Sequence, residues 1–143
     1  IFQSANHVAI QIEMHHEIRI IPIGDAAPSQ LGPATNTGSS RGHWEGDTLV
    51  IDVTSLMPDT WFDSSGNFHS DVLRVEERFT PISANVLQYE ATIEDPKVFT
   101  QPWKIRLPLY RRLEENAQLL EYKCVEFAEE LMYGHLVKKT LEP

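Results

Sequence analysis

The sequence predicts a mainly β domain, built as an antiparallel β-barrel or a strongly curved sheet with one helix near the C-terminus. Three observations support this prediction. About seven segments alternate apolar and polar residues with period two, these segments follow one another without intervening helices, and only residues 125–139 have helical periodicity. Consecutive strands with short connections pair antiparallel, because a parallel pair needs a long crossover. We expect one β-rich domain over residues 1–143, since this length suits a single domain.

The strand segments can be placed by their apolar alternation. Residues 8–12 and 18–23 form the first pair, and residues 14–17 are short enough to be the turn of a hairpin. Residues 24–40 are rich in Gly, Pro and small polar residues and predict a long loop. Further strands are predicted at residues 41–53, 72–79, 85–94, 103–109 and 119–124.

Charge and composition exclude several classes of protein. The chain has 21 acidic and 12 basic side chains, a formal charge of -9, so it repels a phosphate backbone and we expect no nucleic-acid partner. No apolar run approaches the roughly 20 residues of a membrane-spanning helix, so we expect no transmembrane segment. The single cysteine, Cys124, cannot form an internal disulfide.

One acidic residue lies out of phase with its strand. Glu77 shares the phase of Val75 and Phe79, so a regular strand turns its carboxylate toward the core. A buried carboxylate needs a partner, and Arg19 has the matching phase in its own predicted strand. We therefore predict that Glu77 points inward and pairs with an arginine: first Arg19, otherwise Arg41 or Arg74. The alternative is a bulge at Glu76-Glu77 that turns both carboxylates outward.

Other polar residues are candidates for acid–base chemistry. Glu45 and Asp47 share the phase of Leu49, and two carboxylates on one sheet face can act as acid and base or hold a cation. The alternative is a turn or bulge at Gly46-Asp47. His69 lies just before a strand, where it suits a pocket rim. No HxH, HExxH, nucleophile or cofactor motif occurs, so we predict no metal site and no cofactor.

Aromatic side chains are candidates for the walls of a pocket. Trp44, Trp61, Phe62, Tyr89 and Trp103 are available for this role, although core packing is the alternative for each. Together with the charged candidates, they give a predicted set of ligand-binding residues: Arg19, Arg41, Trp44, Glu77 and Tyr89.

Several sequence blocks resemble a widespread family of uncharacterised bacterial proteins, many of them exported, that carry an SRGxWEGDTLVVD signature. The blocks are residues 40–52 (SRGHWEGDTLVID), 68–70, 75–79, 92–96 with 102–103, and 121–127. The resemblance implies a periplasmic or secreted protein, no established activity, and more sequence upstream, so that the chain can be the C-terminal part of a longer precursor. Residues 25–27 differ from the Gly-Arg-x-His stretch of that family. Gly42-His43-Trp44 also resembles the Gly-x-Trp motif of lipocalin barrels, which implies barrel geometry only.

Three functions follow as hypotheses. The first is a β-barrel that binds a small hydrophobic or aromatic ligand, as an antiparallel closed sheet with inward polar residues suggests. The alternative is an accessory subunit of an extracytoplasmic or membrane-associated assembly, with a protein partner. The second alternative is an acid–base lyase, isomerase or hydrolase that uses the candidate catalytic residues Glu77, Glu45, Asp47 and His69.

Overall fold

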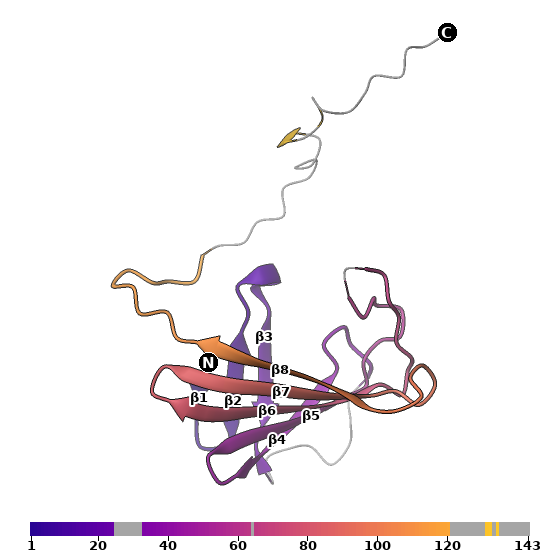
Figure 1. Cartoon of the computed structure of the whole chain (residues 1–143), viewed down its shortest axis with the longest axis horizontal. Helices are drawn as coiled ribbons and strands as arrows, with labels where there is room; N and C mark the ends of the chain where they lie inside the picture. The colour runs from indigo at the N-terminus through magenta and orange to yellow at the C-terminus, as the bar shows by residue number, and fades with distance from the viewer. Residues whose placement is uncertain (25–32, 64, 121–130, 133, 135–143) are drawn as a thin grey trace.

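The computed structural model describes residues 1–24, 33–63, 65–120, 131–132 and 134, and it confirms a mainly β chain with antiparallel sheets (Figure 1). Within these residues, three strands form one sheet and five form the other. The strands are β1 (Phe2–Gln3), β2 (His7–Gln11), β3 (Ile18–Pro22), β4 (Ser39–Glu45), β5 (Thr48–Thr54), β6 (Arg74–Ser83), β7 (Val86–Glu94) and β8 (Trp103–Tyr110).

The three-stranded sheet contains the predicted first hairpin. β2 and β3 pair antiparallel, and the short 3-10 helix η1 (Met14–His16) forms the turn between them. β1 was not predicted; it adds two residues to the outer side of β2. Val8 and Ile21 lie opposite each other on the inner face and are buried, and Arg19 shares that face two residues away.

The five-stranded sheet is a simple meander in which β4 to β8 pair in chain order. The predicted single strand over residues 41–53 is wrong, because β4 and β5 are two strands of a hairpin in which Glu45 pairs with Thr48. Gly46 has a φ of +59° in the connecting turn, a conformation that costs glycine little. The alternative of a turn at Gly46-Asp47 is therefore confirmed.

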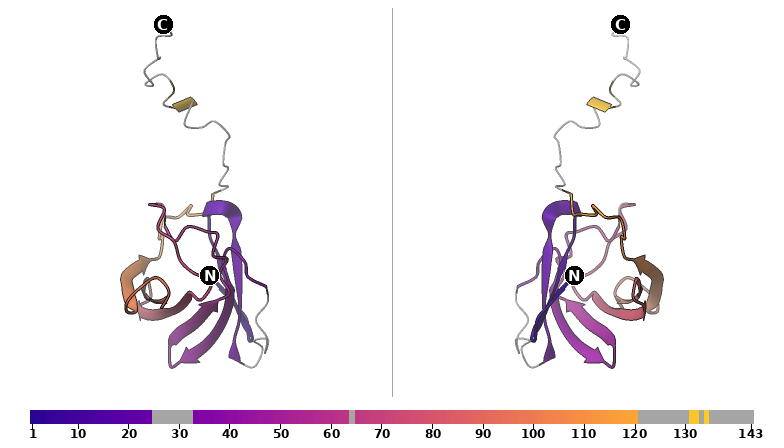
Figure 2. Two further views of the ribbon diagram at one scale, coloured as in Figure 1. Left: turned by 90° about the vertical axis from the view of Figure 1, so that its right-hand side faces the viewer. Right: turned by 90° about the vertical axis from the view of Figure 1, so that its left-hand side faces the viewer.

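The two sheets meet where the end of β3 lies beside β4. Ile23 forms a parallel bridge with Gly42, and the main apolar core lies around this contact. From there the sheets diverge, so that β8 lies far from β2 and β3 (Figure 2). The buried members of this core are Val8, Ile21, Leu49, Ile51 and Val53.

The prediction of a closed barrel is wrong for the described strands. β1 and β8 each end a sheet and do not pair with each other. β8 also contains Lys104 and Pro108, and both residue types are typical of strands left at a sheet edge.

The C-terminal predictions fall mostly outside the described residues. Most of the predicted helix over residues 125–139 and most of the predicted strand over residues 119–124, including Cys124, lie there. Leu119 and Leu120 are described and are not part of a strand. Among the described residues, no helix is both long enough and apolar enough to cross a membrane.

Candidate functional site

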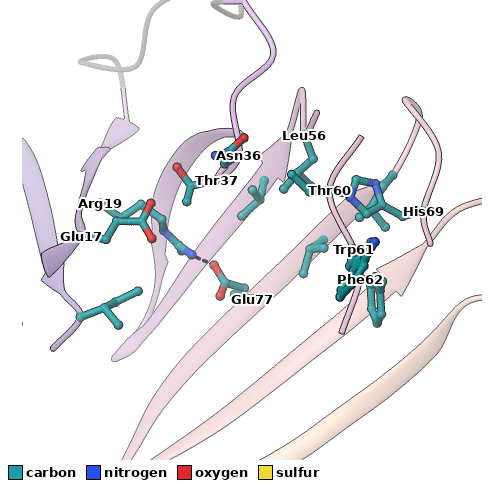
Figure 3. Close-up of a pocket in the computed structure, with 14 residues that line it drawn as sticks. Glu17, Arg19, Asn36, Thr37, Leu56, Thr60, Trp61, Phe62, His69 and Glu77 are labelled. Atoms are coloured by element: carbon teal, nitrogen blue, oxygen red, sulfur yellow. Dashed lines mark hydrogen bonds and ion pairs between the residues drawn. The ribbon is translucent and has the colours of Figure 1, made fainter. Parts of the chain in front are cut away.

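A cavity of about 290 Å³ lies between the two sheets and under the loop of residues 55–73 (Figure 3). One side of it is polar, with side chains from β3 and β6, and the opposite side is aromatic. Apolar side chains of β5 and β6 connect the two sides. The lining residues are Ile12, Glu17, Arg19, Asn36, Thr37, Val53, Leu56, Thr60, Trp61, Phe62, His69, Leu73, Val75 and Glu77.

The predicted ion pair between Arg19 and Glu77 is present in the wall of this cavity. Arg19 Nη2 donates to Glu77 Oε2, and the Tyr89 hydroxyl donates to Glu77 Oε1 at 2.9 Å. Glu77 is only 7% exposed, and it pairs in regular register with Ile51 on one side and Ala91 on the other. This register rules out the bulge alternative, and the two donors satisfy both carboxylate oxygens.

Tyr89 lies beside Glu77 and supports it. Burial, together with the nearby charge of Glu77, raises the pKa of Tyr89 well above its ordinary value. The phenol therefore stays protonated at neutral pH and remains a hydrogen-bond donor. Its ring packs against Phe79 with 4.9 Å between ring centroids. Tyr89 does not line the cavity itself.

The aromatic side of the cavity lies on the connection between β5 and β6. Asp63 organises the tip of this loop, because its carboxylate accepts bonds from Ser65 N at 2.8 Å and Asn67 Nδ2 at 2.7 Å. The Asn67 side chain is the main reason that the pKa of Asp63 lies below its ordinary value. Phe62 N bonds to Asn67 O, and the preceding Trp61 is 74% exposed at the cavity.

Phe62 holds the loop against the sheet. Its ring packs against Trp103 and Phe99 with centroid separations of 5.7 and 6.1 Å, and these two rings contact each other at 5.6 Å. Edge-on contacts of this kind stabilise aromatic clusters. Phe62 and Trp103 therefore serve mainly as packing residues, and Trp61 is left with an exposed ring.

His69 lines the cavity from a buried position, 5% exposed. Its Nε2 lies 2.9 Å from Thr60 Oγ1, and its Nδ1 lies 3.0 Å from the carbonyl oxygen of Ser70. Ser70 is fixed in turn, because Asp95 accepts bonds from Ser70 N at 2.6 Å and Ser70 Oγ at 2.7 Å. Burial opposes ionisation of Asp95, but these bonds and one from Lys97 N lower its pKa below the ordinary value.

Four of the predicted site residues lie away from this cavity: Glu45, Asp47, Trp44 and Arg41. Glu45 is exposed on the outer face of β4, where it accepts from Arg78 and contacts His43 at 3.3 Å, so it does not form an acid–base pair with Asp47. Asp47 and Trp44 line a second, smaller and mostly apolar cavity of about 170 Å³ beside β1.

Arg41 also lies outside the cavity. In the register of β4 and β5 it lies opposite Asp52, and its side chain is on the face opposite to Gly42 and the core. Its Nε and Nη2 atoms are buried and have no hydrogen-bond partner among the described residues. Of the eight predicted site residues, the structure therefore brings Arg19, Glu77 and His69 to one cavity, with Tyr89 behind them.

Sequence reasoning missed several residues of the cavity. Asn36, Thr37, Leu56 and Thr60 come from irregular segments, where alternation gives no information about direction. Glu17 was assigned to the predicted turn, but its backbone is extended just before β3, so that it shares the phase of Arg19.

Comparison with protein-family models finds no match for this chain, and comparisons with curated proteins and with solved structures find none either. Within the described part of the chain, no group of three or more His, Cys, Asp or Glu side chains is placed to hold a metal ion. The function must therefore be argued from the geometry of the cavity.

Proposed function

We propose that the cavity between the two sheets binds a small molecule with an apolar or aromatic body and a polar group at one end. The observation behind this proposal is the lining itself: Val53, Leu56 and Val75 form apolar walls between the Arg19–Glu77 pair and the exposed ring of Trp61. Ligand pockets typically combine mainly apolar walls with a few placed polar groups. A volume of about 290 Å³ suits a small ligand.

The same geometry supports binding better than acid–base catalysis. Both oxygens of Glu77 accept hydrogen bonds from the protein, and both ring nitrogens of His69 lie within hydrogen-bond distance of protein oxygens. A general base must come within hydrogen-bond reach of the substrate proton, and these protein groups compete for the same atoms. The enzyme and accessory-subunit hypotheses stay predictions.

Tryptophan fluorescence tests the proposal, because Trp61 lies in the cavity and Trp44 lies in the second one. We expect small aromatic and amphipathic compounds to raise the melting temperature and to change the emission of the wild-type protein. Trp61→Phe should remove the emission change while a melting shift remains, and the matched variant Trp44→Phe should keep both. An absence of melting shifts across a broad panel would overturn the proposal, and loss of the emission change in Trp44→Phe alone would move the site to the second cavity.

A further inference from the structure

The charges around the cavity do not balance. Two carboxylates, Glu17 and Glu77, face one guanidinium, Arg19, on the polar side (Figure 3). Arg19 and Tyr89 occupy both oxygens of Glu77. The half-buried Glu17 side chain, in contrast, has no hydrogen bond or ion pair with any described residue. Of the two described carboxylates of this wall, Glu17 is therefore the one without a described protein partner.

We propose that the ligand is an amine whose ammonium group pairs with Glu17 while its apolar or aromatic body lies across the cavity toward Trp61. This inference rests on the proposed function and specifies the chemical class of the ligand. A hydrogen bond between an ammonium and a carboxylate is stronger than one between neutral groups, so a cationic ligand gains most from Glu17. The net charge of -9 also favours the approach of a cation over that of an anion.

The opposite choice, a ligand carboxylate bound to Arg19, fits less well. Arg19 already neutralises Glu77, so an incoming anion would meet the uncompensated charge of Glu17. The exposed ring of Trp61 lies on the opposite side, where it can stack on the flat apolar body of the ligand. Figure 3 shows that Glu17 and Trp61 lie on opposite sides of the cavity.

Three probes with the same phenylpropyl body test the inference: 3-phenylpropylamine, 3-phenylpropanol and 3-phenylpropionate. Isothermal titration should give the amine an affinity about tenfold above that of the alcohol, the size of one charge-assisted hydrogen bond, and the propionate the weakest binding. Glu17→Gln should reduce the affinity for the amine to within about threefold of that for the alcohol, and it should leave the affinity for the alcohol unchanged. Asp47→Asn is the matched control, because it removes a carboxylate from the second cavity and should change none of the three affinities.

The outcomes separate this inference from the proposed function. The cation inference would be overturned if amine and alcohol bind equally, if the propionate binds more tightly, or if Glu17→Gln leaves the amine affinity unchanged. In these cases binding of the alcohol would still show that the cavity binds ligands. Loss of amine binding in Asp47→Asn would also overturn the cation inference, because the amine would then occupy the second cavity. Binding of no probe would overturn both proposals. Melting curves of the free variants show whether each one folds.

Discussion

Glu77 receives donors from both sheets, Arg19 from β3 and Tyr89 from β7, and this makes its carboxylate sensitive to substitution. Glu77→Ala leaves the Arg19 guanidinium half-buried without its partner, and we expect a loss of about 3 kcal/mol or more in the free energy of unfolding. Glu77→Gln keeps the shape and one acceptor oxygen, so its loss should be smaller, about 1 to 2 kcal/mol. Urea unfolding measures both values. Equal effects below about 1 kcal/mol would contradict the buried ion pair.

The hydrogen bond from Tyr89 predicts a specific alkaline sensitivity. Burial and Glu77 raise the pKa of Tyr89 above its ordinary value of 10.0, so the unfolded chain loses this proton first. The stability due to Tyr89 is fully present below about pH 10 and is lost as the pH rises further, at up to about 1.4 kcal/mol per pH unit. Tyr89→Phe should remove this part of the slope.

Urea unfolding between pH 9 and 11 measures this slope. The control is Tyr110→Phe, because Tyr110 is largely exposed and its hydroxyl has no hydrogen bond among the described residues. The same alkaline slope in wild type and Tyr89→Phe would show that the phenol is not buried against a carboxylate.

The contact between β3 and β4 depends on a glycine. A Cβ at Gly42 would lie 2.6 Å from Ile23 Cδ1 and 3.0 Å from Ile21 Cγ2, so Gly42→Ala forces the sheets apart or the isoleucines into other rotamers. We expect Gly42→Ala to cost about 1 to 3 kcal/mol in urea unfolding. Ser40→Ala, on the same face of β4, should change stability by less than about 0.5 kcal/mol, because its buried hydroxyl has no partner among the described residues. If both variants unfold alike, the sheets do not meet at this glycine.

The elements show how far alternation predicts this structure. Period two placed Arg19 and Glu77 on facing inner surfaces, because both lie within uninterrupted strands. The same rule failed for Arg41 and Glu45, since the turn at Gly46-Asp47 sets Glu45 opposite Thr48 and thereby reverses the inward phase of β4. The predicted alternative with a turn at Gly46-Asp47 was therefore correct, and the predicted continuous strand over residues 41–53 was wrong.

The cavity as a whole could be predicted only in part. Its ion pair follows from strand phase, but its loop side depends on tertiary contacts such as Asp63 with Asn67 and Phe62 with Trp103. Such contacts leave no periodic signal in the sequence. Barrel closure also failed as a prediction, because alternation identifies strands and not the partners of the outermost ones. The resemblance to an exported bacterial family, and the location that it implies, stay predictions.

At the level of the whole molecule, we propose that a ligand binds between the two sheets and not on their outer faces. An NMR titration of the isotopically labelled protein with 3-phenylpropylamine decides this. Binding is monitored through the chemical shifts of the backbone amides and the indole groups. We predict that the largest shifts belong to residues around the cavity, namely Arg19, Thr37, Thr60, Trp61 and Glu77. Largest shifts at Trp44, Asp47 and Leu87 around the second cavity, or no shifts at saturating amine, would contradict ligand binding between the sheets.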